Sequence, residues 1–491
     1  MLEGEHGNGH IAPVKCFIRA CKGVEQGTTV VFRSMMVSGL ALVAMSTTAE
    51  ARAARQPEDL LPVPAASPVS PPPASVRRSA APAAAVPVDA DATTPAPVIQ
   101  PLPLPEPVMH WSRADAAALL TAILGIEAEG LIPADYQPEA LRNAIAAGEG
   151  TTLDSVASRV FSWLAEDLRD GRTPVPARVQ WFAVDPDRDN DPTSAIMMRA
   201  LDSGDVKGTL DALAPLHPDY AALKAALAAA PRVQTARRAL IRANMDRWRW
   251  LVRDMGSVYL ITNVPEFQLR LTVNNRIIRT YKTVVGKPGR TATPQLAETV
   301  TAVVFNPTWT VPQSIVVGEG LGASLLRAPR RGYKATRGPD GMITVVQQPG
   351  PSNSLGLMKI DMPNPHAIYL HDTPAKQYFN QTMRAESHGC IRTERAVELG
   401  MTMAILGAGL TPEQAVQNSE SGKYTKVPMT RTFPVYLTYF TVGQDITGKL
   451  ATFGDIYGRD APVLASFAKP RAAKTTQRTS TDPIIKLDNP L

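Results

Sequence analysis

The chain has 491 residues, which predicts two folded units with additional tails. Its residues are 44% hydrophobic and 20% charged, which is typical of a globular protein and excludes a wholly disordered chain. The formal net charge is +6, but the basic residues are scattered rather than gathered into a stripe with aromatics, which argues against a nucleic-acid-binding surface. A mildly basic protein is better suited to an anionic envelope.

The first informative segment is a short apolar run at residues 37–45, which follows Arg33. Small residues in an Ala-x-Ala pattern come directly after it, so the run is typical of a secretory signal peptide cleaved near 49–54. The run is too short to span a bilayer, and the mature chain is expected to have no transmembrane span. We therefore assign residues 1–55 to an export region. A core helix or an uncleaved anchor is the alternative interpretation, and Met35 is one candidate start.

Cysteine usage separates one thiol from the other two. Cys16 and Cys21 lie before the expected cleavage site, so the mature chain would keep Cys390 alone. In an oxidising compartment, a free thiol is prone to unwanted oxidation unless it is buried or has a chemical function. A buried, inert thiol is the plain alternative, and the neighbours of Cys390 must decide between the two.

Residues 56–108 are rich in Pro, Ala, Val and Ser and lack the periodicity of a packed element, so they are predicted to form a disordered linker. Residues 109–253 then show apolar side chains at three- and four-residue spacing, which predicts a helical scaffold domain. Its predicted helices cover 113–124, 153–168 and 220–229.

Near residue 256 the apolar period changes to two, and a strand-rich domain is predicted over 256–465, followed by a tail at 466–491. A long segment rich in Gly, Pro and Arg, at about 309–357, is predicted to be a lid or binding loop. The predicted strands are 258–261, 267–273, 277–285, 299–305, 342–346, 367–370 and 433–441, and a helix is predicted at 394–406.

The residues around Cys390 carry the candidate chemistry. A thiol attacks carbonyl groups as its thiolate, so a cysteine enzyme needs an imidazole that takes the proton and later returns it to a leaving amine. Three of the seven histidines, His366, His371 and His388, fall within the 25 residues that end at Cys390. Gly389 leaves the backbone before the nucleophile free to turn its N–H groups toward a developing oxyanion.

The pattern alone leaves the general base open between His371 and His388. His388 would share a face with Cys390 only if that stretch is extended. His366 follows a proline and is predicted to be a loop residue. A zinc site would need three or four ligands, and no second cysteine is available in the mature chain, so neither a metal nor another cofactor is expected.

These residues resemble the L,D-transpeptidase family with a YkuD-type catalytic domain, in the larger branch that carries a helical scaffold domain. The resemblance rests on residues 387–390 with His371, and it extends over about 247–460 and more faintly to 130–136. Its further blocks are 305–312, 349–356, 369–374, 434–440 and 455–460. The implied fold class is α+β, with a mostly β, YkuD-like β-sandwich flanked by helices and a small N-terminal helical domain.

The resemblance also implies roles for the site residues. Cys390 would be the nucleophile and His371 the general base, while His388 and Ser387 would shape the turn. The oxyanion would be held by backbone N–H groups of Gly389 and Cys390, together with the Tyr369 hydroxyl.

Three further residues are candidates for substrate binding under the lid. Trp309 and Asn353 belong to blocks that match the family, and Arg392 follows the nucleophile by two positions. The Arg392 guanidinium could donate two hydrogen bonds to a substrate carboxylate, but a structural ion pair is an equal alternative. The segment from 220 to 248, between the helical scaffold and the catalytic domain, contains only 29 residues. That is too few for a separate peptidoglycan-binding module, so the lid and the scaffold would have to bind the wall.

The implied activity is acyl transfer between peptidoglycan stem peptides in the periplasm, giving 3-3 cross-links that serve wall biogenesis and cell shape. Carbapenems would acylate the same thiol. The enzymatic alternatives are an L,D-carboxypeptidase and a hydrolase that detaches wall-anchored proteins. A non-catalytic envelope scaffold is the third alternative, although it would have no need for an activated thiol.

Overall fold

The structure is a computed structural model that describes residues 107–183, 191–318, 320–431 and 433–472. The predicted export region, nearly all of the linker, Cys16, Cys21 and the end of the tail from 473 lie outside the described residues. Among the helices of the described ranges, none has the length and apolar character that a membrane crossing requires.

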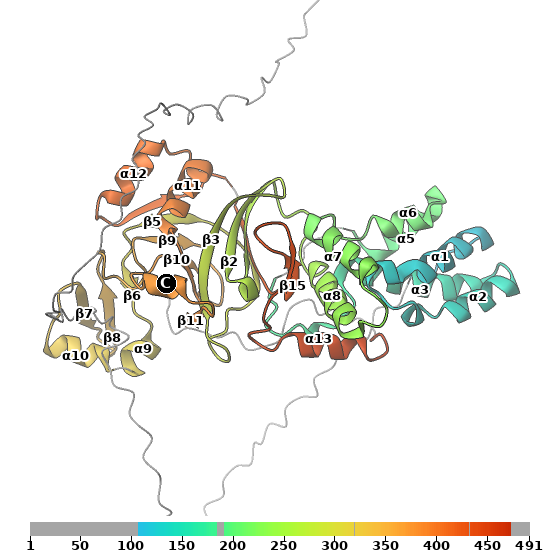
Figure 1. Cartoon of the computed structure of the whole chain (residues 1–491), viewed down its shortest axis with the longest axis horizontal. Helices are drawn as coiled ribbons and strands as arrows, with labels where there is room; N and C mark the ends of the chain where they lie inside the picture. The colour runs from blue at the N-terminus through green and yellow to red at the C-terminus, as the bar shows by residue number, and fades with distance from the viewer. Residues whose placement is uncertain (1–106, 184–190, 319, 432, 473–491) are drawn as a thin grey trace, which may run out of the picture. The chain divides into compact units, whose positions relative to one another are not determined.

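The N-terminal part is helical, as the apolar spacing predicts. Helix α1 begins after Ser112, whose side chain accepts the backbone N–H of Asp115, and it buries Ala116, Leu119 and Ile123. Figure 1 shows α1, α2 and α3 packed together. The elements are α1 (Arg113–Gly125), η2 (Ile126–Glu129), η3 (Pro133–Tyr136), α2 (Pro138–Ala147), α3 (Thr151–Asp170), η4 (Val175–Ala177), α5 (Thr193–Ser203), α6 (Val206–Asp211), α7 (Pro218–Ala229) and α8 (Thr235–Trp248).

The second part is built on one sheet of eleven strands, in the order β13-β5-β9-β10-β12-β3-β2-β1-β14-β4 with β11 paired to β3. The α+β fold class is therefore confirmed, and the strands of the expected sandwich belong to one continuous hydrogen-bonded sheet. The strands are β1 (Val258–Asn263), β2 (Gln268–Val273), β3 (Arg276–Gly286), β4 (Leu296–Thr299), β5 (Ala302–Phe305), β9 (Met358–Asp361), β10 (Leu370–His371), β11 (Ala385–Ser387), β12 (Ile391–Thr393), β13 (Thr425–Pro428) and β14 (Pro434–Thr438).

Smaller elements surround this sheet. Helix α11 covers its core, with Leu399 and Met403 buried against Val303 and Met358 in one hydrophobic cluster. The remaining elements are η5 (Val264–Glu266), η6 (Lys376–Asn380), α11 (Ala396–Ala408), α12 (Pro412–Glu420), β15 (Val442–Gln444), β16 (Leu450–Thr452) and α13 (Asp460–Phe467).

The strand predicted at 299–305 is two strands rather than one. β4 pairs with β14, whereas β5 pairs with β13 and β9. These two strands lie at distant positions in the sheet order, so the chain must leave one sheet position and enter another within a few residues. Val300 is buried and continues the apolar pattern across the break, which is why periodicity alone does not reveal it.

The predicted lid folds as a small unit of its own. β6 (Trp309–Thr310), β8 (Ile343–Gln347) and β7 (Tyr333–Arg337) form a three-stranded sheet, and α9 (Gln313–Gly318) and α10 (Leu321–Arg327) pack beside it. Val311, Val316, Leu325 and Val345 make a separate buried core. The lid is therefore a structured element with its own hydrophobic contacts.

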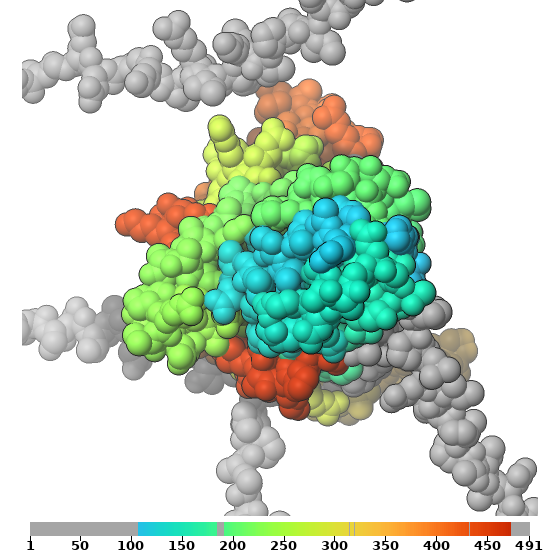
Figure 2. Space-filling model, turned by 90° about the vertical axis from the view of Figure 1, so that its right-hand side faces the viewer, coloured from blue at the N-terminus to red at the C-terminus, as the bar shows by residue number. Residues whose placement is uncertain are grey.

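The helical part and the sheet are joined by buried polar contacts. Arg247 of α8 pairs with Asp460 of α13 at 2.6 Å, and Asn244 of α8 donates to Thr441 at 3.0 Å. The α13 helix returns toward the helices at this place. Figure 2 shows the face formed by the helical residues, with residues near the C-terminal end coloured red beside them.

Asp246 of α8 is fully buried and is predicted to be essential for stability. Its carboxylate accepts the backbone N–H groups of Arg172 at 2.7 Å and Thr173 at 2.9 Å, and it faces Arg249. Replacing it with alanine leaves these donors and a buried guanidinium without their partner, which we expect to cost about 3–5 kcal/mol of unfolding free energy. Denaturant unfolding measures this loss.

The matched control is Asp211→Ala, which removes an exposed ion pair with Lys207 and should leave the unfolding midpoint nearly unchanged. Equal, small effects of the two substitutions would contradict the structural role of Asp246.

Candidate active site

Two short parallel strands position the candidate nucleophile and base. β10 pairs with β12 so that Leu370 lies opposite Ile391 and His371 lies opposite Arg392. Because side chains alternate along a strand, His371 and Arg392 lie on the face opposite to that of Leu370 and Ile391. Cys390 lies in the bend that directly precedes β12, and if the alternation of the strand continues to it, its side chain shares the face of His371. The pairing therefore places His371 opposite Arg392, two positions after Cys390, and the meeting of His371 with Cys390 stays a prediction.

The Cys390 thiol is partly exposed, and its Sγ lies 3.6 Å from the carbonyl oxygen of Ala367. Burial raises the pKa of this thiol to about 11, although hydrogen bonding with Tyr369 and the positive charges of Lys359 and Arg392 oppose that shift. The sulfur is therefore protonated at neutral pH. A base must take its proton before or during attack on a carbonyl.

His371 is buried and neutral. Burial, together with the charges of Arg392 and Lys359, lowers the pKa of its imidazole to about 3, although the hydrogen bond to Asp372 opposes that shift. Its Nδ1 lies 2.5 Å from the carbonyl oxygen of Asp372. Because that oxygen can only accept, Nδ1 carries the proton and Nε2 is left as the basic nitrogen. The group that orients His371 is thus a backbone carbonyl, which no side-chain pattern in the sequence reveals.

The turn before Cys390 is held by Ser387 and Thr293. The Ser387 hydroxyl donates to the Cys390 carbonyl oxygen at 2.6 Å and accepts the Gly389 N–H at 3.1 Å. The Thr293 hydroxyl donates to the Gly389 carbonyl oxygen at 2.8 Å. Gly389 has φ +120°, and a Cβ there would approach Ile368 to 3.1 Å, so glycine is required.

Ser387 and Gly389, two of the predicted turn residues, are therefore held by hydrogen bonds within the turn. Ser387 shapes the turn, whereas the His388 side chain is exposed. The N–H of Gly389 is bonded to Ser387, so its predicted role toward an oxyanion would require that hydrogen bond to open.

Tyr369 connects the nucleophile with the neighbouring charged groups. Its ring meets the ring of His371 edge-on, with centroids 5.5 Å apart, and Lys359 Nζ lies 4.4 Å from its centroid. Burial raises the pKa of its hydroxyl well above the ordinary value, and ionisation of the Cys390 thiol would raise it further. The hydroxyl therefore keeps its proton and remains a donor beside the sulfur.

The three predicted substrate-binding residues occupy different environments. Arg392 is buried, and its guanidinium carbon lies 5.6 Å from the centre of the Tyr378 ring. Trp309 lies in β6 of the lid, paired with Gln347. Asn353 is buried and donates to the carbonyl oxygens of Pro307 and Gln348, each at 3.0 Å, which are contacts that support a loop. Their roles toward a substrate remain predictions.

A pocket of about 500 Å³ adjoins the nucleophile. Ala367, whose carbonyl oxygen contacts the sulfur, is part of its wall. Its volume lies within the range of sites that bind small molecules or peptide side chains. The lining includes Trp309, Lys359, Asp361, Tyr369, Tyr424 and Lys426. Of these, the sequence patterns did not predict Lys359, Asp361, Tyr424 and Lys426. The alternating Lys and Asp of β9 were a visible signal, but the position of Lys426 depends on the fold.

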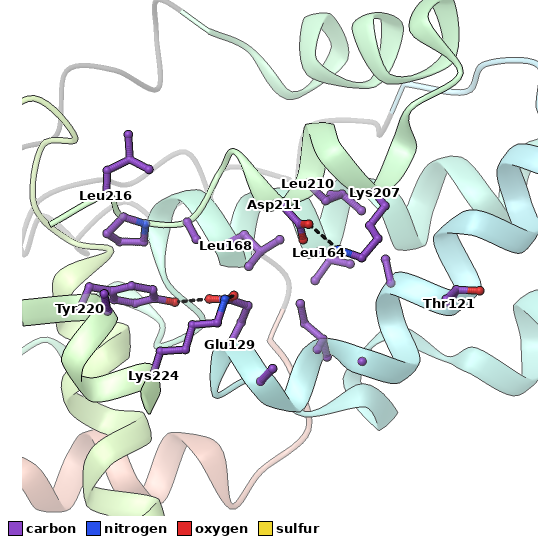
Figure 3. Close-up of a pocket in the computed structure, with 17 residues that line it drawn as sticks. Thr121, Glu129, Leu164, Leu168, Lys207, Leu210, Asp211, Leu216, Tyr220 and Lys224 are labelled. Carbon is purple, nitrogen blue, oxygen red and sulfur yellow. Dashed lines mark hydrogen bonds and ion pairs between the residues drawn. The ribbon is translucent and has the colours of Figure 1, made fainter. Parts of the chain in front are cut away.

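A second pocket, of about 450 Å³, lies among the scaffold helices (Figure 3). Glu129 is bonded there to Tyr220 and Lys224, and Asp211 to Lys207. These charges are already paired, and no thiol is among the lining residues. In the part of the chain that the structure describes, no group of three or more His, Cys, Asp or Glu side chains is placed to hold a metal ion.

Comparison with known proteins gives two family matches. Residues 257–400 match the YkuD family, described as the L,D-transpeptidase catalytic domain, and residues 108–227 match the family described as the scaffold domain. A Haemophilus influenzae protein named "Putative L,D-transpeptidase" is 28% identical over 223 residues. That match covers 42% of this chain and 45% of the relative, so the chain spans less than half of the length of that protein.

Solved structures are also similar over part of the chain. An L,D-transpeptidase from Mycobacterium smegmatis is 16% identical, with 37% of this chain and 58% of that chain covered and a TM-score of 0.19. A crystal structure of an Enterococcus faecium L,D-transpeptidase is 14% identical, with 37% and 50% covered and a TM-score of 0.20. At these scores the similarity adds nothing to the assignment of the site.

Proposed function

The chain belongs to the L,D-transpeptidase family, and from this premise we propose that it is a peptidoglycan acyltransferase that joins two peptide stems through Cys390. The observation that supports the proposal is the parallel pairing of β10 with β12, which sets His371 opposite Arg392, two positions after Cys390. A neutral imidazole whose Nε2 is basic and a protonated thiol are the two components of nucleophilic catalysis by cysteine.

The first step forms a thioester. His371 Nε2 takes the thiol proton while Sγ attacks the carbonyl carbon of the peptide bond that follows the diamino acid of a stem tetrapeptide. The carbonyl oxygen becomes an oxyanion, and in this proposal the Tyr369 hydroxyl and the Cys390 N–H stabilise it. The C–N bond then breaks, and the imidazolium gives its proton to the departing amine of the terminal D-amino acid.

The second step transfers the acyl group. The side-chain amine of a neighbouring stem attacks the thioester carbonyl and loses a proton to His371, which returns it to the departing sulfur. The product is an amide between two diamino acids, a 3-3 cross-link. In this proposal the folded lid excludes water from the thioester and so favours amine over hydrolysis. The stems lie in the periplasm, where the proposed export signal would deliver the chain.

Incubation with purified disaccharide-tetrapeptide muropeptides tests this function. Mass spectrometry should detect a dimer whose mass equals two donors less one terminal D-amino acid. Release of the D-amino acid with water incorporated and no dimer would instead identify a carboxypeptidase. If the folded chain released no D-amino acid and formed no dimer, the proposal would fail.

A further inference from the structure

The face that carries the candidate base continues across three more strands as a row of side chains. Lys426 of β13 lies opposite Val304 of β5, Val304 opposite Lys359 of β9, and Lys359 opposite His371 of β10. Residues opposite one another in adjacent strands share a face. The two lysines therefore stand on the surface that also carries His371.

One carboxylate lies between the two lysines. Asp361 Oδ1 is 3.0 Å from Lys359 Nζ, and its Oδ2 is 3.0 Å from Lys426 Nζ. Each ammonium group has three N–H donors, so a single contact with Asp361 does not exhaust either one. Hydrogen bonding with Asp361 raises the pKa of Lys426, so this amine stays charged at neutral pH.

The pocket beside the nucleophile has an unbalanced positive charge. Lys359, Lys426 and Asp361 are the charged side chains among the described residues that line it, which leaves a net charge of +1. Lys359 is only 13% exposed, so its charge is held in a partly desolvated place where an anion would be attracted more strongly than in water. The pocket shares Tyr369 and Ala367 with the surroundings of the sulfur.

We propose that Lys359 and Lys426 form a subsite that binds a free carboxylate of the stem peptide while its neighbouring carbonyl lies at Cys390. This inference deepens the proposed function and rests on it. The two lysines make the enzyme selective for stems whose carboxylate is unmodified, because a carboxamide at the same position would meet ammonium donors without offering a charge. Asp361 is a positioning residue that holds both amines at the pocket.

A pair of small alkylating reagents tests the charge of the pocket without any need for turnover. Iodoacetate is anionic and iodoacetamide is neutral, and both alkylate the sulfur with loss of iodide. Both rates are measured at the peptide that contains Cys390. The rate with iodoacetate divided by the rate with iodoacetamide should fall about threefold or more in Lys426→Ala and in Lys359→Met. Lys423→Ala, an exposed lysine outside the pocket lining, is the matched control and should leave the ratio unchanged.

A second measurement uses synthetic tetrapeptide stems in which each carboxylate is amidated singly. For the wild type, one of these amides should lower kcat/KM about tenfold or more, and Lys426→Ala should be insensitive to that same change. Equal use of every amidated stem, or a ratio of alkylation rates that no lysine variant changes, would overturn the subsite. Failure of the proposed function would be distinguishable from failure of the subsite. In that case no stem would be turned over, but the ratio of alkylation rates would still measure the charge of the pocket.

Discussion

Replacing Cys390 with alanine is expected to abolish turnover of stem tetrapeptides, with a loss on the order of 10⁴ to 10⁶-fold. The reason is that the variant has no atom that can form the thioester, while the backbone donors and the pocket remain. Cys390 is partly exposed, so removing the sulfur leaves a small gap and should preserve the fold. Thermal unfolding of the variant checks that point.

Carbapenems give this prediction a second readout, because the resemblance implies that they acylate the same sulfur. Intact-mass measurement should detect one adduct on the wild type and none on Cys390→Ala, with peptide mapping to locate it. An adduct of equal yield on both proteins would contradict the assignment of the nucleophile.

Replacing His371 with alanine is expected to lower donor turnover about 10² to 10⁴-fold, because the thiol then loses the base that takes its proton. His110→Ala is the control, since that side chain is exposed and belongs to the helical part. Its turnover should stay within about twofold of the wild type. If both variants retained full turnover, His371 would have no catalytic role.

The pH dependence of alkylation examines the same pair in the resting protein. The pKa of the Cys390 thiol is raised to about 11 and that of His371 is lowered to about 3, so between these values both groups are neutral. The rate of alkylation by iodoacetamide should therefore rise with pH, about tenfold per unit, up to about pH 11. A rate that is fast and constant from pH 5 to 8 would instead indicate a preformed thiolate–imidazolium pair.

The sequence predicts candidate catalytic residues because their chemistry is visible in the chain. Cys390 is the one thiol left after the expected cleavage, and histidines are concentrated just before it. The choice between His371 and His388 needs the fold. His371 is buried in β10 opposite Arg392 of β12, whereas the side chain of His388 is exposed, which favours His371 as the base.

Some contacts of the site have no signal in the sequence. Lys426 meets Asp361 only because β13 and β9 flank β5, although the two residues are 65 positions apart. Similarly, His371 is oriented by a carbonyl oxygen, which every residue possesses. Side-chain patterns in the sequence predict which residue types a site contains, but the pairing of strands in the fold decides which of these residues are in contact.

Helix α8 illustrates a second limit, in the scaffold. Its buried residues include Asn244, Asp246 and Arg247, so the apolar spacing that predicts α1 and α3 is interrupted by polar side chains. These groups are buried because they bond to each other and to distant segments, such as Asp460. Periodicity cannot anticipate a buried face that is stabilised by hydrogen bonds.

The most direct test of the account is rapid-quench mass spectrometry of the protein with a tetrapeptide stem and no acceptor. We expect a mass increase equal to the donor less its terminal D-amino acid, located on the peptide that contains Cys390 and absent from Cys390→Ala. Release of the D-amino acid by the alanine variant, or acylation at a different residue, would contradict it.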